Sequence, residues 1–201
     1  MLRHFIPIIT IAGLFAGFAT AAEMPVAKTS AQAGSGNTVN LMGKPVPLAG
    51  VPIRVGEPLP SAILTGGKMA AVDLAASKGK VRIISVVPSI DTPVCEEQTH
   101  QLSEKTNLDQ RVELVTVSMD LPFAQGRFAK EAKISNVTFL SDYKGGKFGL
   151  SNGLLVEPLN LLARAVIVTD SDNIVRYLQV VPELTALPDM EEAVRVAKSL
   201  L

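Results

Sequence analysis

The hydrophobic positions of the chain form nearly continuous runs that predict strands and helically spaced sets that predict helices between them. Runs rich in β-branched residues are typical of strands covered on both faces. They occupy Val81–Val87, Val112–Ser118, Arg164–Thr169 and Ile174–Val181, with a shorter run at Val137–Leu140. Only the turn residues DSDN separate the two runs that end the series, so we expect these two to form a hairpin.

Helical spacing appears in three segments between and after these runs. The first covers about Pro93 to Lys105, and the second, PFAQGRFAKEA, begins at Pro122. The third begins at Asp189 and carries a single apolar face. That face consists of Met190, Ala193, Val194, Ala197 and Leu201.

The order of these elements predicts an α/β fold in which helices flank a central mixed sheet. Strands and helices alternate up to the hairpin, and a helix closes the chain, which is the thioredoxin-like arrangement. A further hairpin precedes it, because Val39, Leu41, Val46 and Leu48 alternate across a turn at Gly43-Lys44. We therefore expect a thioredoxin-like fold with an N-terminal β-hairpin extension.

The N-terminus has the pattern of an export signal. The basic residues Arg3 and His4 precede an uncharged apolar run at Phe5–Phe18, and Ala19-Thr20-Ala21 matches a small-x-small cleavage site. The run is shorter than the ~20 residues that a membrane-spanning helix needs. We expect a cleaved signal peptide at residues 1–21, and an uncleaved membrane anchor is the alternative.

The rest of the chain divides into a polar segment and one domain. Residues 22–37 are small, polar and glycine-rich, which predicts a flexible tether, and residues 38–201 form the thioredoxin-like domain. No other apolar stretch is long enough to span a membrane. The mature protein is therefore expected to be exported, to the periplasm, and to have no membrane span.

The charge of the chain excludes some classes of function. Lys and Arg total 19, as do Asp and Glu, and the basic residues form no cluster. Nucleic acid is therefore not an expected partner. The Gly-Gly-Lys sequences at Gly66–Lys68 and Gly145–Lys147 lack the spacing of a phosphate-binding loop, so we interpret both as turns.

The chain has one cysteine, Cys95. Exported proteins tend to use cysteines in pairs, so a single thiol indicates a reactive site or an intermolecular bond. The alternative is a buried residue with an unreactive sulfur. Thr92 and Pro93 suit the N-cap and first position of the helix, which places Cys95 in its first turn.

The first turn of a helix stabilises a thiolate through unpaired N–H groups and the helix dipole. Glu96 and Glu97 oppose this effect, so a nearby cation would be needed to outweigh them. His100 follows Cys95 by five residues, roughly 140° around the helix, and is expected to be a solvated helix residue rather than a catalytic partner. Without a histidine cluster or a second cysteine, no metal or cofactor is expected.

Three motifs together resemble the thiol peroxidase subfamily of peroxiredoxins, the atypical two-cysteine type. Pro88, Thr92 and Cys95 have the Pro-x-x-x-Thr-x-x-Cys spacing, and VSMDLPFAQGRF and LARAVIV follow in the same order as in that subfamily. The resemblance extends from about Val39 to the C-terminus.

The resemblance implies a role for each of these residues. Cys95 would be the peroxidatic cysteine, whose thiolate attacks a hydroperoxide and becomes a sulfenic acid. Thr92 would orient the thiolate and the peroxide, and Arg164 would be the cation that stabilises both. Pro88 would shield the sulfur from water. Family members commonly form homodimers, so a homodimer is expected.

One departure from the subfamily changes the expected cycle. The motif LPFAQGRF is normally followed by the resolving cysteine, and here Ala129 stands in that position. An external thiol, from a thioredoxin-like protein or a small molecule, would then reduce the sulfenic acid. The alternatives are an exported thioredoxin-fold binding module with a structural cysteine, and a redox sensor that passes oxidation to a partner protein.

Overall fold

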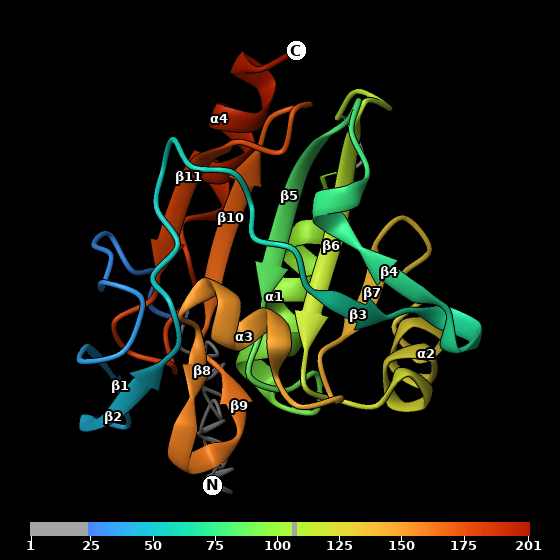
Figure 1. The fold of residues 1–201 in the computed structure, drawn as a ribbon. Coiled ribbons are helices and arrows are strands. Elements are labelled where there is room, and N and C mark those ends of the chain that lie inside the picture. The colour runs from blue at the N-terminus through green and yellow to red at the C-terminus, as the bar shows by residue number, and fades with distance from the viewer. Residues whose placement is uncertain (1–23, 106–107) are drawn as a thin grey trace, which may run out of the picture.

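A mixed sheet of seven strands forms the centre of the computed structural model, which describes residues 24–105 and 108–201 (Figure 1). β5 (Val81–Val86), β6 (Val112–Ser118) and β7 (Thr138–Ser141) run parallel in the middle of the sheet. Antiparallel strands complete it on both sides. These are β10 (Ala165–Thr169) and β11 (Val175–Val180) next to β5, and β3 (Ile63–Thr65) and β4 (Ala71–Asp73) next to β7.

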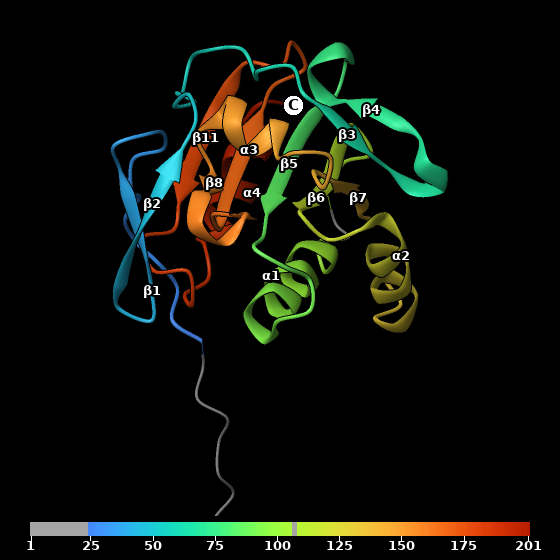
Figure 2. The ribbon, with the colours of Figure 1, turned by 60° about the horizontal axis from the view of Figure 1, so that its bottom comes forward.

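The helices cover both faces of this sheet. α1 (Pro93–Ser103), α2 (Pro122–Glu131) and α4 (Met190–Ser199) lie on one face, and the short α3 (Lys147–Asn152) lies on the other (Figures 1 and 2). Successive side chains of a strand point to opposite faces. Ile83 accordingly packs beneath the three helices, while Ile84 packs on the α3 side. The mixed sheet with flanking helices confirms the predicted fold class.

A second, smaller sheet carries the N-terminal hairpin. β1 (Thr38–Leu41) and β2 (Lys44–Ala49) pair with each other, and β2 also pairs with β8 (Leu155–Val156), which pairs with β9 (Leu161–Leu162). The turn residues are Met42 and Gly43, with φ of 52° and 75°, and not the expected Gly43-Lys44. Positive φ at both positions gives the type I′ geometry that suits a two-residue hairpin.

The polar segment before this hairpin differs from the expected flexible tether. The backbone N–H groups of Ala27 and Ala31 donate to the carbonyl oxygens of Leu187 and Val180, both at 2.8 Å. Lys28 Nζ lies 2.8 Å from Asp189 Oδ2 at the start of α4. Residues 24–37 are small and polar, as a tether would be, but they are attached to the domain, because backbone hydrogen bonds join them to Leu187 and to β11. The predicted signal peptide, residues 1–21, lies outside the described residues.

Several short elements had no recognisable sequence pattern. They are β3, β4, β8, β9, α3 and the 3₁₀ turns η1 (Gly67–Met69), η2 (Leu74–Ala76) and η3 (Glu157–Leu159). Two or three residues are too few to show a hydrophobic period, and the 6 residues of α3 make fewer than two helical turns. Leu201, expected on the apolar face of the last helix, lies beyond the end of α4 and is exposed. None of the helices in residues 24–105 and 108–201 could cross a membrane.

Candidate active site

The loop after β5 delivers Cys95 to the N-terminus of α1. Pro93 occupies the first helical position, where its missing N–H leaves no hydrogen bond unmade. The Cys95 backbone N–H donates to the carbonyl oxygen of Thr92 at 3.0 Å. The Thr92 hydroxyl makes no N-capping hydrogen bond. It lies 2.9 Å from Cys95 Sγ instead, with the Ser89 carbonyl oxygen as a second acceptor at 3.3 Å.

The sulfur atom is enclosed by apolar side chains. Cys95 is 0% exposed and clusters with Val87 and Ile90. Ala124 and Phe128 of α2 pack against this cluster. Pro88 directly follows Val87 and is half-buried at the start of the loop. The apolar side chains that cluster around Cys95 come from the loop and from α2, and Pro88 is not one of them, so its predicted role in shielding the sulfur stays a prediction.

Arg164 contacts Cys95 from the position just before β10, the strand that pairs with β5 on the side away from β6. It directly precedes β10, and the exposed fraction of the residue is 2%. Its Nη2 lies 3.2 Å from Cys95 Sγ, and its Nε donates to the Leu184 carbonyl oxygen at 2.9 Å. The structure thus brings Thr92, Cys95 and Arg164 together, although Arg164 is 69 residues away from the cysteine in sequence.

Gln98 holds the guanidinium in place. Its Oε1 accepts a hydrogen bond from Arg164 Nη1 at 2.7 Å, and its Nε2 donates to Ser85 Oγ on β5 at 2.7 Å. Gln98 lies three residues after Cys95, so both side chains are on the same face of α1. Sequence reasoning missed this residue, and its spacing from Cys95 was the available signal.

His100 also differs from expectation. Its ring packs edge-on against the Phe128 ring, with centroids 6.5 Å apart, so it joins α1 to α2. Its Nε2 lies 3.7 Å from a carboxylate oxygen of Glu96. It is therefore a contact between helices and not a fully solvated residue, because α2 packs beside α1 (Figure 2).

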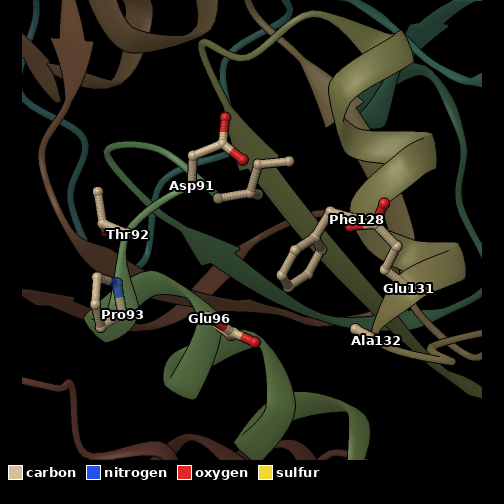
Figure 3. Close-up of a pocket in the computed structure, with 8 residues that line it drawn as sticks. Asp91, Thr92, Pro93, Glu96, Phe128, Glu131 and Ala132 are labelled. Carbon is tan, nitrogen blue, oxygen red and sulfur yellow. The ribbon is translucent and has the colours of Figure 1, made fainter.

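A pocket of about 420 Å³ opens between the start of α1 and α2. Figure 3 shows the Phe128 ring in the middle of this pocket, with Thr92 and Pro93 on one side and Glu131 and Ala132 on the other. Asp91 and Glu96 complete its polar rim. The pocket therefore reaches the Thr92 residue whose hydroxyl contacts the sulfur.

Comparison with protein families identifies the group to which this site belongs. The Redoxin family model matches residues 54–194, which include Thr92, Cys95 and Arg164. The chain belongs to the Redoxin family. Curated relatives of this redoxin narrow the assignment. It is 44% identical to a thiol peroxidase of Halalkalibacterium halodurans over 165 residues, which are 82% of this chain and 99% of the relative.

Other relatives agree with this assignment. The redoxin is 40% identical to a thiol peroxidase of Staphylococcus aureus, over 81% of this chain and 98% of the relative. A peroxiredoxin-like protein from Aquifex aeolicus superposes with a TM-score of 0.77 at 40% identity, covering 82% and 97% of the two chains. A thiol peroxidase from Chromobacterium violaceum shares the fold, with a TM-score of 0.71 at 20% identity. The redoxin is a thiol-dependent peroxidase.

The helix that carries Ala129 lies next to the site of this redoxin. Ala129 is half-buried near the end of α2, one residue after Phe128. Its carbonyl oxygen accepts a hydrogen bond from the Ile134 N–H at 2.9 Å, which closes the end of the helix. With Cys95 as the only cysteine of the sequence, a disulfide within the chain cannot form.

Proposed function

We propose that Cys95 carries out the entire thiol chemistry of this peroxidase in a one-cysteine cycle, in which an external thiol completes each turnover. The observation that carries the proposal is the contact of 3.2 Å between Arg164 Nη2 and Cys95 Sγ in a buried setting. Hydrogen peroxide and organic hydroperoxides are the substrates, and antioxidant defence is the biological role.

The partners of Arg164 support a reactive thiolate at Cys95. Its guanidinium donates to the carbonyl oxygens of Leu184 and Val94, to Gln98 Oε1 and to the sulfur. Among the described residues, no carboxylate lies within ion-pair distance of it. A buried charge is stable only when it is paired. The Cys95 thiolate is the group that would pair with it, and Thr92 donates a hydrogen bond to the same sulfur.

The peroxide step uses these three groups together. The thiolate attacks the distal oxygen of the hydroperoxide, the O–O bond breaks, and Cys95 becomes a sulfenic acid. The hydroxide or alkoxide that leaves takes a proton from solvent and departs as water or an alcohol, respectively. Arg164 and Thr92 stabilise the charge that develops on the oxygens, as preorganised donors do in a site that excludes water. The peroxide enters beside Thr92, because this residue is exposed and borders the pocket.

Reduction of the sulfenic acid requires two external thiols. The first forms a mixed disulfide with Cys95 and releases water. The second attacks this disulfide, restores the Cys95 thiol and leaves the oxidised disulfide of the reductant. A thioredoxin-like protein or a small thiol fits this requirement, since the chain itself has no second sulfhydryl.

Stoichiometric peroxide oxidation tests the proposal. One equivalent of hydrogen peroxide, added without reductant, should convert Cys95 to a sulfenic acid that dimedone captures, and excess peroxide should give a sulfinic acid. Intact mass and peptide mapping measure both products. A treated chain that neither labels nor gains oxygen would instead support a binding module. Mixed disulfides with a partner protein, without turnover on added thiols, would support a redox sensor.

An Ala129→Cys variant tests the missing step directly. The resemblance places the resolving cysteine at Ala129, so the variant should form a disulfide between Cys95 and Cys at that position after peroxide treatment. The first turn of α1 and the end of α2 must open locally for this, because the two Cα atoms have to approach within roughly 7 Å. Non-reducing peptide mapping detects the bond. The variant should also resist over-oxidation, and its failure to do so would contradict the assignment of Ala129.

The proposal includes export to the periplasm and a homodimer. The apolar run and the Ala19-Thr20-Ala21 motif support cleavage after residue 21 or 22. N-terminal sequencing of the exported protein measures this, and an intact Met1 on a membrane-bound chain would contradict it. Exposed Leu121 and Phe123 at the start of α2 offer apolar surface for self-association. Sedimentation analysis tests the dimer, and a monomer at all concentrations would exclude it.

A further inference from the structure

Asp120 links the end of β6 to the loop between β5 and α1, residues 87–92, which leads to Cys95 and is called the cysteine loop below. It follows β6 by two residues and precedes the start of α2 by two. One of its carboxylate oxygens accepts a hydrogen bond from Ser89 Oγ, and the other accepts one from the Ile90 N–H, both at 2.8 Å. Its carbonyl oxygen accepts a hydrogen bond from Ser141 Oγ at 2.5 Å, at the end of β7. The residue therefore joins the cysteine loop to two strand ends.

The bonds from Asp120 lead to the sulfur in few steps. Ser89 and Ile90, which Asp120 holds, come directly before the Asp91-Thr92 segment, and Ile90 packs in the same cluster as Cys95. The carbonyl oxygen of Ser89 is within 3.3 Å of the Thr92 hydroxyl, which contacts the sulfur. The position of this loop therefore determines where the Thr92 hydroxyl lies relative to the sulfur.

The two halves of the cycle place opposite demands on this loop. The peroxide step needs the Thr92 hydroxyl and Arg164 in place around a sulfur sheltered from water. The thiol step needs a second sulfur to reach Cys95 Sγ, which is fully buried in the closed structure. A thiol much larger than a peroxide can approach only when the loop and the first turn of α1 open locally. One half-reaction therefore uses the closed loop and the other uses the open loop.

We infer that Asp120 is a positioning residue that sets the balance between the closed and open states of the cysteine loop, an inference that rests on the one-cysteine cycle proposed above. Its carboxylate can accept both donors of the loop at once, and it is anchored outside the loop at the end of β6. Weakening this contact slows reaction with peroxide and speeds reaction of the sulfenic acid with an external thiol.

The test measures the two half-reactions separately in Asp120→Asn. An asparagine retains one acceptor oxygen, but its amide group presents a donor where the second oxygen accepted a bond. Losing one hydrogen bond to a charged group should shift the ratio of closed to open loop about tenfold. The acceleration of sulfenic acid reduction by 2-mercaptoethanol and the slowing of the peroxide step should therefore multiply to about tenfold, with the larger share in the reduction step because the closed loop predominates. Dimedone quenching with intact mass follows both rates.

Asp142→Asn is the matched control. Asp142 directly follows β7, much as Asp120 lies just beyond β6, and its carboxylate likewise accepts hydrogen bonds from two backbone or side-chain donors, here the Phe148 and Gly149 N–H groups at 3.0 and 2.8 Å. These belong to α3 on the opposite face of the sheet from α1. Both half-reactions of this variant should proceed at the wild-type rates.

The outcomes separate this inference from the proposed function. If the wild-type chain forms no sulfenic acid, the one-cysteine cycle is wrong. If it does, unchanged rates in Asp120→Asn, or an equal slowing of both steps, overturn the role of Asp120. If Asp120→Asn does not fold, Ser89→Ala removes one of the two contacts. This variant should also slow the peroxide step and speed reduction of the sulfenic acid, each by a smaller factor. Unchanged rates in Ser89→Ala would then overturn the inference.

Discussion

Arg82 and Arg164 are both 2% exposed and lie at opposite ends of two neighbouring strands, yet their partners differ. Arg82, near the start of β5, pairs in register with Thr169 at the end of β10, while Arg164 directly precedes β10. The Arg82 Nε lies 2.8 Å from a carboxylate oxygen of Glu113 on β6. At the other end, Arg164 meets a sulfur and neutral oxygens.

The difference between their partners suggests two uses of a buried arginine: Arg82 contributes to stability, and Arg164 has the proposed role in reactivity. The remaining donors of Arg82 bind the Leu74 and Ser77 carbonyl oxygens and the Asn173 amide, so its charge and its hydrogen bonds are satisfied by fixed groups. Arg164 has no carboxylate partner among the described residues and instead donates to the sulfur of Cys95, whose negative charge it would stabilise in the proposed cycle. A buried guanidinium without a fixed counter-charge therefore distinguishes the candidate active site from the structural ion pair at Arg82.

Arg82→Leu should produce the largest effect, on stability. It leaves the half-buried Glu113 carboxylate and the buried acceptors of Arg82 without their partner, which should cost up to about 3–5 kcal/mol. Denaturant unfolding should show this loss, while the rate of peroxide reduction per folded molecule stays unchanged. An equal loss of rate in the folded variant would mean that the two arginines are not functionally distinct.

Arg164→Leu should produce a loss of similar size in the reaction rate. Removing one preorganised donor at developing charge typically costs about 10²–10³-fold in rate. The second-order rate constant with hydrogen peroxide, from stopped-flow measurement, provides the test. Arg164→Lys keeps the charge but loses the forked donor geometry, so it should recover only part of the rate. A wild-type rate in Arg164→Leu would contradict the role assigned to this residue.

Asp189→Ala should have a smaller effect than either arginine substitution, because its ion pair is at the surface. The carboxylate caps α4 by accepting from the Glu192 N–H at 3.1 Å, and the loss of such a cap costs about 1 kcal/mol. The matched variant Lys28→Ala removes only the exposed partner, so it should cost less. If Lys28→Ala proves as destabilising as Arg82→Leu, burial does not explain the difference between the ion pairs.

The same carboxylate provides a pH test of the cap. The hydrogen bond from Lys28 holds the pKa of Asp189 below its usual value, although partial burial opposes this. A lowered pKa in the folded state means that the stabilisation is present above the ordinary Asp pKa and is lost as pH falls through the folded-state value. The stability gap between wild type and Asp189→Ala should therefore narrow in acid. Unfolding curves at neutral and low pH measure this, and a constant gap would contradict the assignment.

Local patterns predicted the long elements of the fold well. The runs at Val112–Ser118 and Pro122–Ala132 match β6 and α2 to within a residue, because their period and their helix-starting proline are local properties. The short strands β3, β4, β8 and β9 exist only through their pairing partners. The same holds for residues 24–37, whose composition predicted a tether but whose backbone pairs with β11 and with Leu187.

The residues of the candidate site also divide into those that the sequence predicted and those that only the structure revealed. Thr92 is the N-cap of α1 and Cys95 lies in its first turn, so their contact could be predicted from their spacing in the sequence. Arg164 was identified through the resemblance of its motif to thiol peroxidases, since nothing local indicates where a distant arginine will point. Gln98 and Asp120 went unnoticed because their importance lies in what they contact, namely Arg164 and the loop at Ser89-Ile90.

The sequence by itself determined the order of the long strands and helices, the position of Cys95 in the first turn of a helix, and the absence of a second thiol. These follow from periodicity, from residue preferences at helix starts and from the single cysteine. The tertiary structure decided which charges are buried and what they face. Cys95 and Arg164 are 69 residues apart, and Arg82 and Glu113 are 31 apart. Only the pairing of strands brings such residues together, because the physics of a buried charge depends on its neighbours in space.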